Sequence, residues 1–262
     1  MFNVSPEQER RHIVDDSALN GFLTKMYSIM GLAVLVSALT AYLTLTVFSG
    51  SLLPLLTNRV FLWVLLLLPL ILSVGISFKA TRKPTTAFFM LMAIAVIYGL
   101  EFSLLAFAYT GAQIGGAFIS ASAVFIGMAA YGSVTKKNLD TIGAYASAAI
   151  WGLIVASLVN MFLKSTPASF IFSIIGVIIF TILTAWDAQK MKSIYASYGD
   201  QLPELGLAVN GALMLYLDFI NLFIMLMQLL GQRRIGVARR HVAGTPRDDG
   251  VGHRSAAGFF ER

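Results

Sequence analysis

Cysteine is absent from this sequence of 262 residues, and histidine is rare. Without cysteine, the chain has no disulfide, no thiol catalysis and no cysteine metal site. The three histidines, His12, His241 and His253, all lie in the polar ends of the chain. A histidine-based catalytic triad, a haem ligand or a zinc site inside a membrane is therefore not expected. We predict no enzymatic activity, no catalytic residues and no bound cofactor.

Charged residues are also scarce. They make up 12% of the chain, against 57% hydrophobic residues, whereas soluble domains carry about 25%. The net charge of +6 does not indicate nucleic acid binding, because lysine and arginine fall in short clusters between long apolar runs. Such clusters orient helices in a bilayer. The composition therefore predicts a polytopic membrane protein whose main partner is lipid.

Seven apolar segments reach the length of about 20 residues that a membrane-spanning helix needs. They comprise residues 22–47, 60–79, 86–109, 114–135, 141–162, 169–190 and 207–230. Because these runs are continuously apolar, they predict helices and not the alternating strands of a β-barrel. We expect an all-α transmembrane domain over residues 22–230. A polar extension without a signal peptide precedes it over 1–21, and a basic, disordered tail follows over 231–262.

Basic residues gather on one side of the expected helices. That side holds Arg10, Arg11, Lys25, Lys79, Arg82, Lys83, Lys136, Lys137, Lys190 and Lys192, and the other side holds Arg59 and Lys164. The positive-inside rule places the first side, with the N-terminus, in the cytoplasm. Seven crossings then leave the arginine-rich tail outside, against the rule. Either the last segment does not cross fully or the other spans override the tail, and we favour a full crossing.

Small residues recur at helical spacing in segment 114–135. They are Gly116, Ser120, Ala123, Gly127 and Ala130. Such a stripe lets a neighbouring helix approach closely. It fits either a central helix or ordinary helix packing, and we favour ordinary packing.

Three carboxyl groups fall within the expected spans, namely Glu101, Asp187 and Asp218. A carboxylate at the bilayer centre costs at least ~2.5 kcal/mol, which makes each of them a functional candidate. The midpoint between Asp187 and Asp218 falls between Leu202 and Pro203, inside a segment that Gly199 and Pro203 mark as a turn. Two antiparallel helices that rise from this turn bring both aspartates to the same height.

Two carboxyl groups in contact inside a membrane are expected to share one proton and to titrate as a unit. Loss of that proton adds repulsion at the helix contact and creates an anionic site. The spacing therefore predicts a pH-controlled gate.

Each carboxyl group also has an alternative interpretation. Asp187 can form an ion pair with Lys190, three residues later on the same helix. Asp218 has no basic neighbour in sequence and shares its helix with three amides, Asn210, Asn221 and Gln228, which favours a polar internal face. Glu101 can pair with Arg59 or line an ion pathway, and these two readings stay open.

Several motifs resemble one membrane protein family. Residues 215–223 read LYLDFINLF, which resembles the last-helix signature of the Bax inhibitor family in its bacterial branch. Further matches are FLTKMY at 22–27, YGL at 98–100, KKNL at 136–139 and Trp186-Asp187. The resemblance covers residues 20 to 231 and leaves the arginine-rich tail outside.

The resemblance implies seven helices, six of which surround a central one, and a pH-sensitive calcium leak through a bacterial inner membrane. It implies that Asp187 and Asp218 form the di-aspartyl pH sensor and gate, with Arg82 or Lys79 as a basic partner of Asp187. The chain departs from some members in two places: Leu70 and its neighbours are apolar, and Met227-Gln228-Leu229 lacks an arginine. A latch between those two positions is therefore not expected.

Two classes of function remain. The first is calcium transport, with calcium as the permeant ion, transient binding near the aspartate pair, and Glu101, Asn210 and Asn221 along the path. No tightly bound metal is expected, because three carboxylates offer few of the oxygen ligands that calcium prefers. The second is a scaffold that binds other membrane proteins, such as a protease. A retinal photoreceptor is excluded, because residues 207–230 contain no lysine, and proteolysis lacks a recognisable glycine-bearing motif.

Overall fold

The computed structural model describes residues 16–56 and 58–243, which form eight helices within those ranges. The helices are α1 (Asp16–Thr46), α2 (Ser49–Leu56), α3 (Arg59–Lys79), α4 (Pro84–Ala108), α5 (Gly111–Val134), α6 (Asp140–Leu163), α7 (Thr166–Tyr198) and α8 (Glu204–Ala243). All except the short α2 are long and apolar enough to cross a membrane, so the seven predicted spans are confirmed. The first 15 residues, residue 57 and residues 244–262 lie outside the described part of the chain.

Helix ends follow local capping signals. Thr110 and Gln113 form a capping box at the start of α5, in which each side chain bonds the other residue's backbone N–H. Ser165 caps α7 beside Pro167, and Lys164 ends α6 with a φ of 50°, in the left-handed region that breaks a helix. These caps fix the short turns that hold consecutive spans antiparallel.

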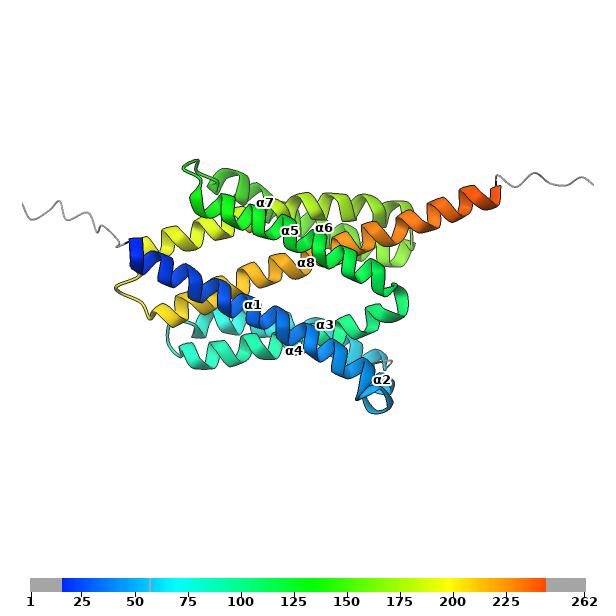
Figure 1. Cartoon of the computed structure of the whole chain (residues 1–262), viewed down its shortest axis with the longest axis horizontal. Helices are drawn as coiled ribbons and strands as arrows, with labels where there is room; N and C mark the ends of the chain where they lie inside the picture. Colours follow the sequence, from blue (N-terminus) through cyan, green and yellow to red (C-terminus); the bar gives the residue numbers. More distant parts are fainter. Residues whose placement is uncertain (1–15, 57, 244–262) are drawn as a thin grey trace, which may run out of the picture.

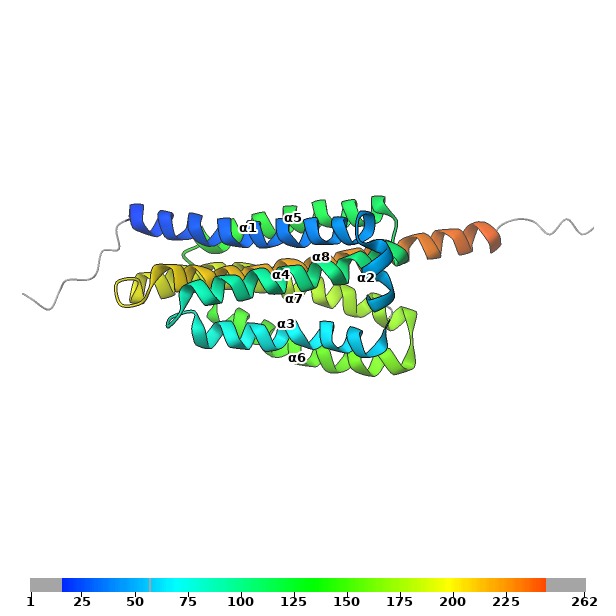
Figure 2. The same ribbon diagram turned by 90° about the horizontal axis from the view of Figure 1, so that it is seen from below.

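The spans lie in three layers, which Figure 2 shows edge-on. Helices α4, α8 and α7 form the middle layer, α1 and α5 cover one side, and α3 and α6 cover the other. Helix α8 packs on α1, α3, α4, α5 and α7, and it is the most buried of the spans, so it takes the central place that the resemblance implies for one helix (Figure 1). Its position makes any side chain of α8 a neighbour of several others.

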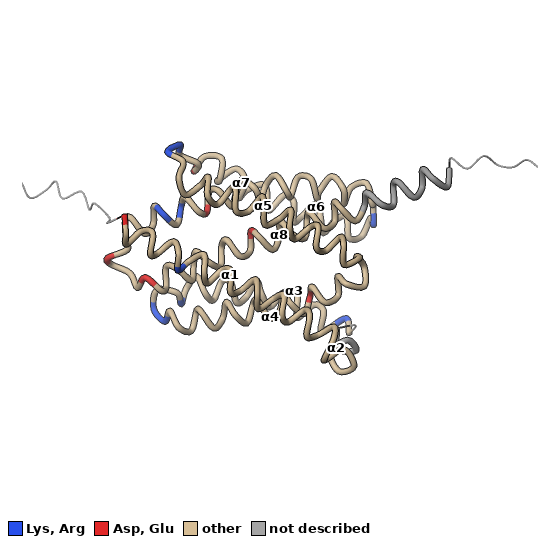
Figure 3. Tube along the Cα trace, in the orientation of Figure 1, with Lys and Arg blue, Asp and Glu red and all other residues tan. Residues whose placement is uncertain are grey.

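The two ends of the described chain lie at opposite ends of the bundle (Figure 1). Lysine and arginine gather at the end where α1 begins, as Figure 3 shows. At this lysine-rich end, the Lys25 ammonium of α1 lies 2.7 Å from the Glu204 carboxylate at the start of α8. Helix α8 therefore crosses the full bundle and leaves at the other end.

Helix α8 corrects the expected boundary of the tail. Disorder was predicted from residue 231, but the helical backbone continues to Ala243. Residues 232–243 lack apolar periodicity, but they contain arginine, alanine and glutamine, which favour helix regardless of burial. The rest of the predicted tail and most of the polar N-terminal extension lie outside the described residues.

The predicted small-residue stripe of α5 is not the face that packs. Ala123, Gly127 and Ala130 are exposed. The buried face instead holds Ala117, Ala121, Phe125, Ala129 and Gly132. Small residues occur on both faces of this helix, so spacing alone selected the wrong one. Helix α5 also lies at the periphery of the bundle, which agrees with our preference for ordinary helix packing over a central helix.

Gly132 is the most closely packed glycine of α5, and it gives a stability prediction. A Cβ atom there would collide with the Ala185 backbone of α7. We expect Gly132→Ala to destabilise the bundle by about 1–3 kcal/mol, the usual cost of overpacking. Thermal unfolding in detergent measures this. The control is Gly127→Ala on the same helix, where no atom lies within 4 Å of an added Cβ. Equal melting temperatures for the two variants would contradict the close α5–α7 contact.

Candidate functional site

The two aspartates singled out by sequence meet between α7 and α8. The turn between these helices comprises residues 199–203, where it was predicted. Asp187 and Asp218 are each only 6% exposed, and their side chains lie within hydrogen-bonding reach of each other. Because ionised carboxylates only accept hydrogen bonds, a hydrogen bond between them requires one proton on the pair. The turn-midpoint argument therefore placed the two groups correctly.

Each carboxyl group of the pair also has one oxygen without a hydrogen-bond partner among the described residues. These atoms are Asp187 Oδ1 and Asp218 Oδ2, and both are buried. A buried acceptor without a donor is costly, and in native proteins such atoms mark functional sites or hydrated ones. Two neighbouring carboxyl groups and two unsatisfied acceptors thus lie together inside the described part of the bundle.

A cation near the pair is Lys190, three residues after Asp187 on α7. It acts electrostatically on Asp187, and its Nζ lies 4.6 Å from the centre of the Trp186 ring. No ion pair joins Lys190 to Asp187 among the described residues, so the alternative interpretation of Asp187 as an ion pair is not supported. Lys79 and Arg82 are both exposed, and neither forms an ion pair with Asp187 within the described ranges. Their role as its partners stays a prediction.

Three residues of α7 that sequence reasoning missed hold Asp187 in place. Trp186 Nε1 donates to Asp140 Oδ1 over 3.0 Å, and Gln189 accepts from the Leu139 N–H over 2.9 Å. Lys192 Nζ donates to the Ser133 carbonyl oxygen over 2.9 Å. These bonds tie one face of α7 to the ends of α5 and α6, which turns Asp187 toward α8. All three partners are distant in sequence, so no local pattern signals them.

The amides of α8 form a line along one face of the helix. Asn210, Asn221 and Gln228 are separated by 11 and 7 residues, which are close to whole numbers of helical turns. All three are partly exposed, as are Met214 and Leu217 on the same face of the helix. The line extends ~27 Å, close to the ~30 Å thickness of the hydrocarbon core. The amides of the last helix therefore share one face, but this face is partly exposed and also holds Met214 and Leu217, so the predicted polar internal face is not confirmed. We call this row of amides the amide line.

The amide line ends in a partly polar pocket of about 590 Å³ between α6, α7 and α8, at the end of the bundle opposite the lysines. Gln228, Asn160 and Lys164 line this pocket. Gln228 Oε1 accepts from the Ser173 hydroxyl over 2.9 Å. A polar vestibule thus lies at the end of the amide line.

Glu101 lies apart from the aspartate pair. Its charge acts on the Tyr98 and Tyr216 hydroxyls, and Tyr216 is on a different face of α8 from the amide line. The Tyr216 hydroxyl lies 2.7 Å from Ser37 Oγ of α1. Glu101 Oε1 is buried without a hydrogen-bond partner among the described residues, and no ion pair joins Glu101 to Arg59 in that part of the chain. The structure therefore does not support the pairing of Glu101 with Arg59. Its other interpretation, as part of an ion pathway, stays a prediction.

Comparisons with known proteins agree with the fold and the motifs. The family model described as "Inhibitor of apoptosis-promoting Bax1" matches residues 19–235. An uncharacterized protein of Lactococcus lactis, YrjE, is 38% identical over 81% of this chain and 91% of its own length. An uncharacterized membrane protein of Streptococcus pyogenes serotype M3 is 37% identical over 83% of this chain and 95% of its own length.

A third relative carries a location in its name. The inner membrane protein YbhL of Escherichia coli is 36% identical over 83% of this chain and 94% of its own length. The family model covers nearly the whole seven-helix domain, and positions 187 and 218 fall within the residues that it matches. This chain is an integral membrane protein, and it belongs to the Bax inhibitor family.

Proposed function

We propose that this protein is a pH-sensitive calcium leak channel of the bacterial inner membrane, gated by the proton that Asp187 and Asp218 share. The observation that carries the proposal is the contact between these two buried carboxyl groups. This contact joins α7 to the central helix, so a change in its charge acts directly on the core of the bundle. The lysine-rich end, with the N-terminus, faces the cytoplasm in this proposal.

The sign of the pH response follows from the shared proton. At low pH the pair keeps its proton, and the hydrogen bond holds α7 against α8. As the pH rises the proton is lost, and two like charges ~4 Å apart repel by about 4 kcal/mol at an effective dielectric constant near 20. A change of this size shifts a two-state equilibrium on the order of a hundredfold or more. Calcium flux is therefore expected to rise with pH.

The amide line supplies the path for the ion. Calcium prefers oxygen ligands, and the carbonyl oxygens of Asn210, Asn221 and Gln228 follow one face of α8. The deprotonated pair adds a transient anionic site beside this line. With so few ligands the site favours passage over tight binding, and Lys164 in the outer vestibule keeps the flux low. Glu101, which lies on a separate face, is the weaker candidate for the path.

Flux into vesicles tests this function. The purified full-length chain is reconstituted into vesicles loaded with a calcium-sensitive dye, and external calcium is added at several values from about pH 6 to about 8, where a carboxyl pair in a membrane changes charge. We expect protein-dependent calcium entry that increases with pH, compared with protein-free vesicles. Absence of entry at every pH would overturn the channel and leave the membrane scaffold as the function.

A further inference from the structure

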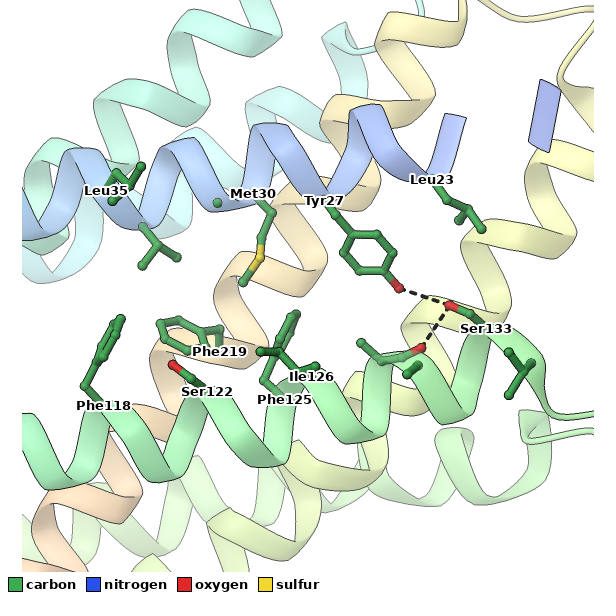
Figure 4. A pocket seen from close by; sticks show the side chains of 15 residues that line it. Leu23, Tyr27, Met30, Leu35, Phe118, Ser122, Phe125, Ile126, Ser133 and Phe219 are labelled. Carbon is green, nitrogen blue, oxygen red and sulfur yellow. Dashed lines mark hydrogen bonds between the residues drawn. The ribbon is translucent and has the colours of Figure 1, made fainter. Parts of the chain in front are cut away.

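An apolar groove opens on the side of the bundle between α1 and α5. Both helices pack on α8, and the groove between them has a volume of about 560 Å³. Its walls are α1 from Leu23 to Leu35 and α5 from Phe118 to Val134, and Phe219 of α8 forms its floor, as Figure 4 shows. We call it the α1–α5 groove. It shares no residue with the aspartate pair or the amide line.

The groove is shaped for a flexible apolar chain. Its floor is rigid, because the Phe219 ring packs edge-on against the rings of Phe118 and Phe125, with centroids 5.8 and 5.7 Å away. Its rim is open to the bilayer, since Leu35 is 67% exposed and Val134 is 74% exposed. An acyl chain can therefore enter from the side without any opening of the bundle.

The length of the groove matches one leaflet. From Leu23 to Leu35 the wall extends ~18 Å along α1, and half of a hydrocarbon core is ~15 Å thick. A second apolar pocket of about 360 Å³ continues along α1 toward the opposite end and shares Val34, Phe118 and Phe219 with the first. The α1–α5 groove thus covers the leaflet at the lysine-rich end of the bundle.

The end of the groove in that leaflet is polar and positively charged. The Tyr27 hydroxyl lies 3.1 Å from Ser133 Oγ, which joins α1 to α5 there. Lys192 Nζ donates to the carbonyl oxygen of the same Ser133 over 2.9 Å, and an ammonium has three N–H groups. Among the described residues, two donors of Lys192 therefore remain beside Ser133, which lines the groove. The exposed Lys136 follows Val134 of the rim by two residues.

We propose that the α1–α5 groove binds one anionic phospholipid, with an acyl chain on Phe219 and the headgroup phosphate at Lys192 and Lys136. The apolar part of the groove is about as long as one leaflet is thick, and lysines lie at the level of the headgroups. These two features favour an anionic phospholipid as the occupant. A bound lipid in this position holds α1 and α5 apart while both stay packed on the central helix.

Native mass spectrometry of the full-length chain tests the proposal. Delipidated protein in detergent is titrated with phosphatidylglycerol or with phosphatidylcholine that has the same acyl chains. We expect one phosphatidylglycerol per chain, bound about fivefold more tightly than phosphatidylcholine for each lysine that contacts its headgroup. Lys192→Gln should reduce this preference about fivefold. Equal affinity for the two lipids in the parent protein would overturn the anionic headgroup site.

Gly31→Trp tests the groove itself. Gly31 lines it, and no atom lies within 4 Å of an added Cβ, so the indole fills the groove without a backbone collision. We expect both lipids to bind about tenfold more weakly or worse. The control is Gly152→Trp on α6, which also meets no atom within 4 Å and should bind like the parent.

Two outcomes overturn the groove as the lipid site. One is an equal effect of Gly31→Trp and Gly152→Trp. The other is a complex of two chains that Gly31→Trp dissociates, which would make a second copy the occupant. If Gly31→Trp does not elute as a folded monomer, Ala130→Phe on the opposite wall replaces it, because Ala130 is exposed and lines the same groove.

Discussion

Asp218→Asn is expected to remove the pH dependence of calcium flux. An asparagine amide can donate a hydrogen bond to the Asp187 carboxylate without any shared proton. The α7–α8 contact then persists at every pH, because no second negative charge can form. Flux into reconstituted vesicles should stay low and flat across the pH range in which the parent flux rises.

The companion variant and the control sharpen this prediction. Asp187→Asn should give the same flat profile, since it removes the other half of the pair. Glu101→Gln is the matched control, because Glu101 is also a carboxyl group within a span with a buried oxygen, and no interaction of it with either aspartate is found among the described residues. It should keep the pH profile of the parent. If both aspartate variants also keep it, the paired sensor is wrong even where calcium flux itself is real.

Asn221→Leu is expected to reduce flux and to leave its pH dependence in place. Asn221 Nδ2 donates to the Leu217 carbonyl oxygen over 2.8 Å, so its own carbonyl oxygen is the atom offered to an ion. Loss of this ligand in the middle of the amide line should lower calcium entry about tenfold, the equivalent of ~1.4 kcal/mol. The same vesicle assay measures the amplitude at each pH.

Met214→Leu provides the control for the amide line. Met214 is another partly exposed residue of α8, and methionine and leucine exchange with little cost. Its variant should conduct like the parent. If Asn221→Leu also conducts like the parent, the ion does not follow the amide line. Together with Asp218→Asn, these variants separate the path from the sensor.

The aspartate pair could be predicted from sequence because charge inside a membrane is costly. With so few charged residues, a carboxyl group within a span stands out. The turn at Gly199 and Pro203 then fixed the relative height of Asp187 and Asp218. Both inferences use only the positions of residues in the chain and the rise per residue of a helix. Neither depends on how the other helices are arranged.

The partners of Glu101 could not be predicted in the same way. Glu101 was expected to pair with Arg59 or to line a path, and the structure places it beside Tyr98 and Tyr216. In the sequence, nothing distinguishes these two tyrosines from the other aromatic residues of the spans. The bonds of Trp186, Gln189 and Lys192 to α5 and α6 were missed for the same reason. Such contacts depend on which helices become neighbours.

The sequence by itself determined the membrane class, the seven spans and the carboxyl groups that lie within them, because apolar length and buried charge have large free energies at single positions. Only the tertiary structure decided which face of each helix is internal. A span is apolar on its lipid side as well as on its packed side, so the exposed Gly127 and the buried Gly132 of α5 look alike until α7 is in place. The α1–α5 groove likewise exists because both helices pack on α8.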